Sequence, residues 1–216
     1  MTPPVAEGLI IAARRSLVLG LNQGTSGNIS VRQADGAFLI SPSGSRLDAL
    51  QAADLVSLSL AGEPEPGRAS SEWRLHRDIY RVRPDVGAVL HTHSRFATTL
   101  ACLRQELPAV HYLIAAAGTS VVRCSRYATF GTAALSAAAV SALGSAAACL
   151  LANHGLVAVG ATPDQALEVA CEVEAVAEWY WRASAIGTPI LLDDKEMEDA
   201  LARFRDYRAG RTKLSP

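Results

Sequence analysis

Apolar and polar positions alternate along this chain with two different periods. A helical spacing of apolar residues runs from Val5 to Leu21, and short runs with the period of a strand follow at 29–32, 37–40 and 55–58. The dipeptide Asp35-Gly36 separates the first two of these runs, and this dipeptide is typical of a tight hairpin turn. The pattern therefore predicts one helix followed by an antiparallel hairpin and a further strand.

Capping residues, Pro and Gly mark the ends of the later helices. Thr162 begins a capping box, and Pro163 has the fixed φ that suits a first helical position. Asp193 is placed to cap a last helix, whose end we expect at Gly210. The helices predicted in this way start near Ser71 and stop before Pro84, run from about 163 to 187, and run from about 194 to 208.

The segment Tyr127–Pro163 contains no Asp, Glu, Lys or Arg and is long enough to suggest a membrane span. However, Gly131 and Gly144 interrupt it, and much of it is Ala and Ser. We expect a buried Ala-rich helix at about 132–143, a core strand at 149–152, a turn that carries His154, and another strand at 156–159.

Hairpins that alternate with helices predict an α/β fold with a central mixed, mostly antiparallel sheet between two helix layers. The chain has 216 residues, half of them apolar, and no linker rich in Pro, Gly or Ser divides it. We therefore expect a single domain that spans residues 1–216.

Charge and cysteine content narrow the range of partners. The formal net charge is −1, from 20 basic and 21 acidic residues, so we expect neither a nucleic-acid partner nor a membrane partner. Any anionic ligand must then be bound by local groups. No basic region precedes the first apolar stretch, and no Cys-x-x-Cys pair is present among the four cysteines, Cys102, Cys124, Cys149 and Cys171. These features predict reduced thiols and a cytoplasmic protein.

Three histidines are candidates for metal ligands. His91 and His93 follow the apolar run 86–90, and side chains two apart on a strand point to the same face. His154 lies in a predicted turn beside a glycine. Three imidazoles from two strand ends can hold a catalytic zinc with one open coordination position. The alternative is that each histidine is an ordinary core or surface residue.

Lysines are nearly absent from this chain. Only Lys195 and Lys213 occur, both in the polar C-terminal region, and Lys195 lies among acidic residues. A lysine that forms a Schiff base must be desolvated to lose its proton at neutral pH. If the protein acts on a carbonyl compound, a metal must therefore supply the electron sink.

Three short polar motifs are candidates for an oxyanion site. The segments 24–28, 41–44 and 70–71 place hydroxyl groups beside glycines or at a predicted helix start, where backbone N–H groups are free. Taken singly, each is more often an ordinary turn or cap than an anion site. Glu72 directly follows the third motif. It is either a general base beside phosphate and metal or an acid that favours the helix N-terminus.

The order of these motifs resembles that of the class II, metal-dependent aldolases of the aldolase II/adducin superfamily, in particular those that act on L-fuculose 1-phosphate. The segments that carry the resemblance are 20–28, 70–74, 91–93, 111–118, 127–132 and 154–156. The resemblance implies a three-layer α/β/α domain and a homotetramer with active sites at subunit interfaces. It also implies one zinc ion per subunit, and a ketose 1-phosphate substrate that is cleaved to dihydroxyacetone phosphate and a small aldehyde.

The resemblance also assigns roles to residues. Zinc would be bound by His91, His93 and His154. Glu72 would move the C3 proton of the donor, Tyr112 would donate a proton from a neighbouring subunit, and Tyr207 would be a mobile tyrosine that closes the site. The phosphate would be held by Gly27, Asn28, Ser43, Gly44, Ser70 and Ser71. We assign no role to His111 and interpret His76 as structural.

Three other functions fit parts of the pattern. Epimerases, dehydratases and decarboxylases of the same superfamily act on phosphorylated sugars with the same metal and phosphate sites. Adducin-like members are interaction modules that lack the metal histidines. A cupin-type oxygenase with non-haem iron also uses His-x-His, Glu and His, but there the glutamate follows the histidine pair on the sheet.

Overall fold

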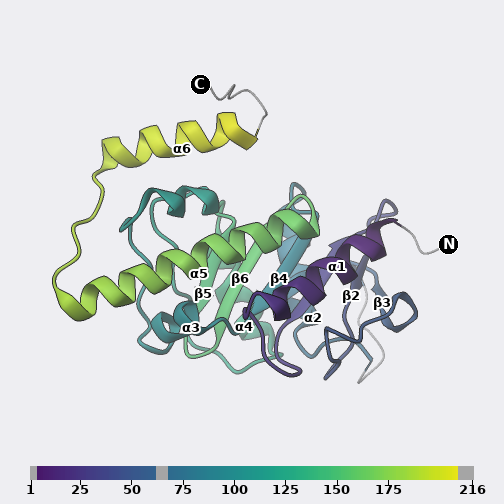
Figure 1. Ribbon diagram of the computed structural model, residues 1–216. Helices are drawn as coiled ribbons and strands as arrows, with labels where there is room; N and C mark the ends of the chain where they lie inside the picture. Colours follow the sequence, from purple (N-terminus) through teal and green to yellow (C-terminus); the bar gives the residue numbers. More distant parts are fainter. Residues whose placement is uncertain (1–3, 62–67, 209–216) are drawn as a thin grey trace.

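A six-stranded sheet forms the middle layer of the fold, and helices cover both of its faces (Figure 1). The computed structural model describes residues 4–61 and 68–208. The strands are β1 (Asn28–Arg32), β2 (Phe38–Ile40), β3 (Val56–Leu58), β4 (Ala88–Thr92), β5 (Ala148–Leu151) and β6 (Gly155–Gly160), in the spatial order β3-β2-β1-β4-β6-β5. Every pairing between these strands is antiparallel, and an isolated parallel bridge joins Cys124 to Leu150 in the edge strand β5.

The first two strands form the predicted hairpin. The backbone N–H of Gln33 donates to the Ala37 carbonyl at 2.8 Å, and the N–H of Gly36 donates back to the Gln33 carbonyl at 3.1 Å. Gly36 has a φ of +85°, a conformation that residues with a Cβ rarely adopt. The turn pairs Arg32 with Phe38 and so sets the register of the whole hairpin.

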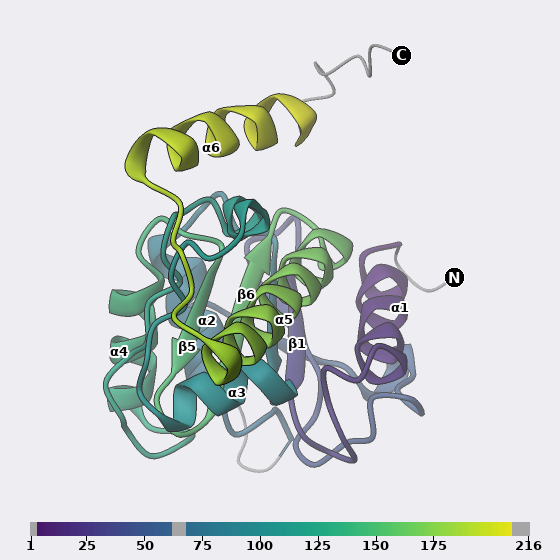
Figure 2. The ribbon, with the colours of Figure 1, turned by 60° about the vertical axis from the view of Figure 1, so that its left-hand side comes forward.

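The helices lie in two layers (Figure 2). One layer contains α1 (Pro4–Val18), α3 (Arg95–Cys102) and α5 (Pro163–Ile186), and the other contains α2 (Trp73–Val82) and α4 (Ala133–Leu143). Two short 3-10 helices are η1 (Ala52–Asp54) and η2 (Tyr112–Ala117). Each layer buries its own apolar cluster against one face of the sheet, which confirms the predicted α/β/α arrangement.

The Ala-rich helix α4 begins where we predicted, because the side chain of Thr132 accepts a hydrogen bond from the backbone of Leu135. The expectation that this helix is buried is only partly right. Leu135 and Ala139 are buried, whereas Ala134 and Ala137 are exposed. Alanine is small enough to suit either environment, so composition alone does not separate the two faces of such a helix. Within the described ranges, no helix has the length and apolarity that crossing a membrane requires.

The last two helices also begin at the predicted caps. Thr162 accepts a hydrogen bond from Gln165 at the start of α5, and Asp193 exchanges hydrogen bonds with Glu196 at the start of α6 (Asp194–Arg208). An extended segment separates the two helices, so α6 lies apart from the sheet and beside η2 (Figures 1 and 2). The predicted end at Gly210 lies outside the described residues.

Candidate metal centre and active site

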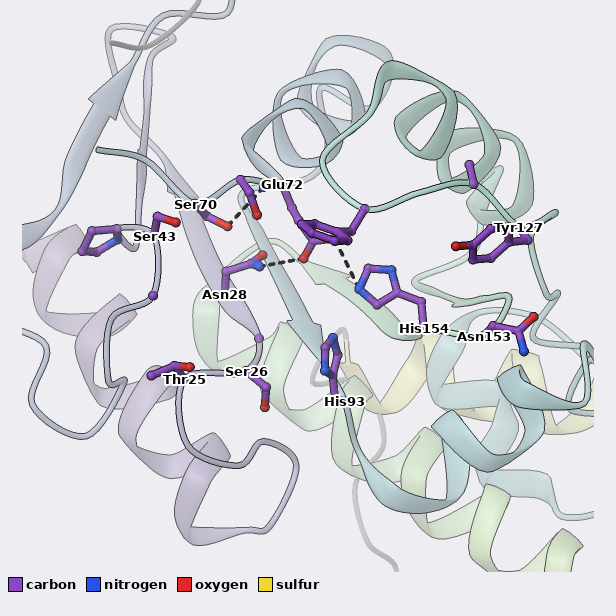
Figure 3. A pocket seen from close by; sticks show the side chains of 16 residues that line it. Thr25, Ser26, Asn28, Ser43, Ser70, Glu72, His93, Tyr127, Asn153 and His154 are labelled. Atoms are coloured by element: carbon purple, nitrogen blue, oxygen red, sulfur yellow. Dashed lines mark hydrogen bonds and ion pairs between the residues drawn. The ribbon is translucent and has the colours of Figure 1, made fainter. Parts of the chain in front are cut away.

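The candidate site is a cavity of about 320 Å³ at one end of the three central strands. Asn28 begins β1 and pairs with His91 near the end of β4, and the neighbouring strand β6 begins directly after His154. The antiparallel register therefore places the start of β1, the end of β4 and the start of β6 side by side at the same end of the sheet, where the strands terminate. Figure 3 shows the side chains that line the cavity.

The three histidines converge at this end of the sheet. The ring centroid of His91 lies 4.9 Å from that of His93 and 4.7 Å from that of His154. Their nearest ligand nitrogens all lie within 4.8 Å of one another. The prediction that a His-x-His pair meets a third histidine from a turn is confirmed. Their spacing is that of a metal-ligand set.

Local backbone features position these rings. Asn153 has a φ of +53°, and His154 donates its N–H to the Leu151 carbonyl at 3.0 Å, so the turn into β6 is tight. A Cβ on Gly155 would overlap the backbone carbonyl of Thr92, so only glycine lets β6 approach β4 so closely. On the other side, the Asn22 side chain accepts a hydrogen bond from the backbone N–H of His93 at 3.0 Å.

His91 has the tautomer that metal binding requires. Its Nδ1 lies 3.0 Å from the carbonyl oxygen of Leu156, which can only accept, so Nδ1 carries the proton and donates it. The Nε2 lone pair is then directed into the cluster. Burial lowers the pKa of His91 to about 4, against the opposing effect of the Glu72 carboxylate. His91 is therefore neutral near pH 7.

Glu72 lies at the N-terminus of α2 and faces the histidines. Its Oε2 accepts a hydrogen bond of 2.9 Å from Nδ2 of Asn28 and lies 3.2 Å from Nε2 of His91. Its Oε1 is buried, lies 3.4 Å from Nε2 of His154, and has no hydrogen-bond partner among the described residues. Burial opposes ionisation, but His91, His154 and the bond from Asn28 together hold the pKa of Glu72 below its usual value.

The predicted oxyanion motifs form one wall of the cavity (Figure 3). A bridge between Pro42 and Ala69 brings the second and third motifs side by side. Gly27 and Gly44, with φ values of +78° and +64°, turn the backbone in the first and second motifs. No Lys or Arg of the described chain lines this cavity, so an anion here would be bound by hydroxyl and backbone N–H groups.

Nine of the predicted site residues line this cavity: Gly27, Asn28, Ser43, Gly44, Ser70, Ser71, Glu72, His93 and His154. His91 is fully buried behind them. Tyr112 and Tyr207 are 53% and 62% exposed, and within the described part of the chain neither lines the cavity. Tyr112 instead stacks on His111 and faces Phe204 of α6.

Sequence reasoning gave no role to Tyr127, Phe130 and Asn153, which also line the cavity. Tyr127 and Asn153 lie on the side opposite Thr25 and Ser43 (Figure 3). The segment 127–132 was part of the family resemblance and was the available signal. Its position depends on Gly131, where a Cβ would lie 3.0 Å from the carbonyl oxygen of Ser71.

Three converging imidazoles, a buried carboxylate and a cavity wall of hydroxyl and backbone N–H groups are the groups that metal-assisted proton abstraction uses. The family described as "Class II Aldolase and Adducin N-terminal domain" matches residues 7–181, and the chain belongs to this family. It is a class II aldolase.

Named relatives and a solved structure agree with this assignment. The chain is 51% identical, over 93% of its length and 91% of the relative, to the "5-methylthioribulose-1-phosphate/5-deoxyribulose-1-phosphate aldolase" of Rhodospirillum rubrum. It is 44% identical, over 88% of each chain, to the "L-fuculose phosphate aldolase" of Escherichia coli strain K12. A solved "L-fuculose 1-phosphate aldolase" superimposes with a TM-score of 0.90 at 36% identity, covering 95% of this chain and 98% of its own.

Proposed function

We propose that this protein reversibly cleaves a ketose 1-phosphate whose terminal carbon is deoxygenated, giving dihydroxyacetone phosphate and a small aldehyde. One observation carries the proposal: a single cavity brings together the oxyanion motifs, the Glu72 carboxylate and the imidazoles of His93 and His154, with His91 directly behind them. The named activities of the relatives at 51% and 44% identity support the same reaction class.

The site residues fit a divalent metal, for which zinc is our proposal. His91, His93 and His154 would hold it, because three neutral imidazoles are a preferred zinc ligand set. The Glu72 carboxylate beside His154 adds a negative charge that favours a cation at this position. When bound, the metal supplies the positive charge that stabilises an enediolate.

The oxyanion motifs would bind the phosphate of the substrate. Ser43, Gly44, Ser70 and Ser71 contribute the wall, and Gly27 lets the first motif approach. The Asn28 amide nitrogen already donates to Glu72, and its second hydrogen leaves one donor for the phosphate. A neutral cradle of this kind agrees with the absence of Lys and Arg from the described lining.

Glu72 would act as the base that removes the C3 proton of the donor and returns it in the reverse direction. Its burial keeps water away from the carboxylate, and its bond from Asn28 fixes one oxygen. Oε1 remains unpaired and is the oxygen that we assign to proton transfer.

The aldehyde part of the substrate would lie at the Tyr127 end of the cavity, opposite the phosphate (Figure 3). Tyr127 and Asn153 lie at this end, and the apolar side chains of Ala128 and Phe130 also line the cavity. These apolar side chains suit the methyl or methylthio terminus of a 5-deoxypentulose 1-phosphate better than a free hydroxyl. We therefore favour that substrate class, and L-fuculose 1-phosphate, which releases L-lactaldehyde, is the second candidate.

We also propose the assembly that the family resemblance implies. Residues 1–216 would form a single domain in a cytoplasmic homotetramer, with Tyr112 and Tyr207 acting in the site of a neighbouring subunit. The exposure of both tyrosines outside their own cavity supports this arrangement. The four unpaired cysteines agree with a reducing compartment.

A coupled assay of dihydroxyacetone phosphate release across a panel of sugar phosphates tests the proposal. We expect turnover of 5-deoxyribulose and 5-methylthioribulose 1-phosphates, and slower turnover of L-fuculose 1-phosphate. Ribulose 5-phosphate, which carries its phosphate at the other end, is the control. If no ketose 1-phosphate is turned over and a sugar-acid phosphate is, the protein is a decarboxylase instead.

A further inference from the structure

A chain of buried hydrogen bonds extends from Glu72 into the interior of the protein, away from the cavity. Beyond Asn28, which donates to Glu72, the Asn28 oxygen lies 2.5 Å from Nε2 of His76. Nδ1 of His76 lies 2.7 Å from the Ser30 hydroxyl, and this hydroxyl lies 2.8 Å from that of Tyr80. All five side chains are at most 6% exposed.

The chain crosses back and forth between one helix and one strand. Glu72 is the N-cap of α2, and His76 and Tyr80 follow it in the helix at intervals of four residues. Asn28 and Ser30 are two residues apart on β1. Four helical residues rise about 6.0 Å, and two strand residues rise about 6.7 Å. Because these distances nearly match, the side chains of the two elements alternate in a ladder.

The chemistry of the groups sets the donor direction at every rung. Nδ2 of Asn28 donates to the carboxylate of Glu72, so the acceptor Oδ1 faces His76. Nε2 of His76 must then carry the proton. Burial lowers the pKa of His76 to about 3, so the ring is neutral and its Nδ1 must accept from Ser30. The single Ser30 proton is thereby used, and Tyr80 donates to the Ser30 oxygen.

A reversed Asn28 amide would break this order. Its oxygen would lie about 3 Å from the Glu72 oxygen, and two acceptors at that distance repel. Its NH₂ group would meet Nε2 of His76, which could accept only in the other tautomer. That tautomer would direct an N–H at Ser30, which could then donate to the Tyr80 hydroxyl, so the far end of the ladder accepts either direction. The contact between the Asn28 amide and the Glu72 carboxylate therefore decides the orientation, and His76 takes the tautomer that matches it.

We propose that His76 is a positioning residue of the aldolase site. Its Nε2–H holds the oxygen of the Asn28 amide, so that the amide nitrogen donates to Oε2 of Glu72 and Oε1 stays unpaired beside the three histidines. The interpretation of His76 as merely structural is thereby extended. This inference rests on the proposed role of Glu72 as the base. It gives His76 an effect on the reaction without contact with the substrate.

The test compares His76→Gln with His76→Leu. Glutamine retains an amide N–H near the position of Nε2 and can still donate to Asn28, whereas leucine fills the space without a donor. We expect exchange of the C3 proton of dihydroxyacetone phosphate to slow by about 10- to 100-fold in His76→Leu. In His76→Gln we expect a loss of less than about three-fold, because a donor to the Asn28 oxygen remains. The loss should be in kcat rather than KM.

Two measurements separate this role from packing. Metal content must stay at the wild-type level in both variants. The control is Ser136→Ala. Ser136 is a buried residue of α4 whose hydroxyl bonds to the Arg74 carbonyl and to Asp78 of α2, the helix that also carries His76. We expect this variant to leave the exchange rate unchanged. If leucine supports exchange as well as glutamine does, His76 only fills space and the proposal is wrong.

The tautomer of His76 gives a readout that does not depend on activity. Two-bond ¹H–¹⁵N correlation spectra of the wild-type protein should show a neutral ring with its proton on Nε2. A proton on Nδ1, or a charged ring near pH 7, would overturn the proposal even if neither variant folds. If the wild type does not exchange the C3 proton at all, the proposed function fails instead, and the tautomer still decides whether the ladder has this direction.

Discussion

Oε2 of Glu72 lies 3.2 Å from Nε2 of His91, so the proposed base and the deepest of the metal-site histidines are in direct contact. The contact joins α2 to β4. It means that a change in the carboxylate acts on the metal site and on proton transfer together. Variants of Glu72 must therefore be tested for metal content as well as for activity.

Glu72→Gln should reduce C3 proton exchange of dihydroxyacetone phosphate by about 10²- to 10⁴-fold, the usual loss for a general base. The amide keeps the shape of the side chain and can accept from Asn28, so inhibition by inorganic phosphate should change little. Solvent deuterium incorporation followed by NMR measures the exchange. Glu178→Gln, which changes a half-buried carboxylate of α5 that is paired with Arg182 outside the cavity, is the control. Unchanged exchange would return Glu72 to the role of a helix-start acid.

Metal analysis should find about one divalent cation per chain, and zinc should restore activity after chelation. His93→Ala should lose most of this metal, because it removes one of three ligands. His111→Ala is the matched control, since His111 caps η2 and is not one of the three converging histidines. Full occupancy in His93→Ala would exclude the assigned ligand set.

The metal-free protein should lose stability as the pH falls below about 6.5. Burial lowers the pKa of His76 to about 3 and that of His91 to about 4, and unfolding restores both to near 6.5. Between these values the unfolded chain binds more protons than the folded chain. The free energy of unfolding should then fall by about 1.4 kcal/mol per pH unit for each histidine.

Urea titrations of the chelated protein between about pH 5 and pH 7.5 measure this slope. The stability contribution of both groups is fully present above the unfolded pKa and is lost as the pH decreases. His76→Gln removes one titrating group, so the slope should decrease by about 1.4 kcal/mol per pH unit, while His91 and the other histidines with a lowered pKa, His93 and His111, keep their share. A flat profile in the wild type would mean that these histidines are not buried in the neutral form.

Borohydride added with substrate should not inactivate the enzyme, whereas a chelator should. Lys195 has a side chain that is 73% exposed and bonded to Asp199 at 2.6 Å, so it is not desolvated as an imine-forming lysine must be. Lys213 lies outside the described residues. Mass spectrometry of the treated protein is the measurement, and a covalent adduct on either lysine would contradict the metal mechanism.

Local signals predicted most of the fold. Thr162 and Asp193 identify helix starts through their own hydrogen bonds, and Asp35-Gly36 identifies the hairpin. The two faces of α4 were not predictable, because Ala134 and Ala139 are the same residue in different environments. The periodicity of a helix is only visible when its two faces differ in polarity.

The candidate site was predicted less completely. The pairing of His91 with His93 follows from the period of a strand, but their distance to Glu72 depends on how α2 packs on the sheet. The hydrogen-bond ladder through His76 combines two elements that are more than 40 residues apart in sequence, so no local pattern reveals it. For Tyr112, the role in a neighbouring subunit comes from the family resemblance of segment 111–118 and not from any contact within one chain.

Tyr112→Phe should slow carbon–carbon bond cleavage but spare C3 proton exchange, because the proposed proton donor acts only on the aldehyde oxygen. Glu72→Gln should impair both steps. The two variants thus separate the two proton transfers. Tyr127→Phe is a useful comparison, since Tyr127 lines the cavity of its own chain and is exposed to nearly the same extent, 55% against 53%. Equal losses in cleavage and exchange for Tyr112→Phe would assign the residue to another role.

Mixed oligomers test whether Tyr112 acts across an interface. Chains with Tyr112→Phe keep the metal site, and chains with His91→Ala keep the tyrosine, so each homo-oligomer should cleave substrate poorly. In a mixed oligomer, some interfaces join an intact metal site to an intact tyrosine, and part of the cleavage activity should return. Differently tagged chains purified in tandem provide verified mixtures. If such mixtures stay inactive, or if a stable monomer is fully active, Tyr112 does not complete the site of a neighbouring subunit.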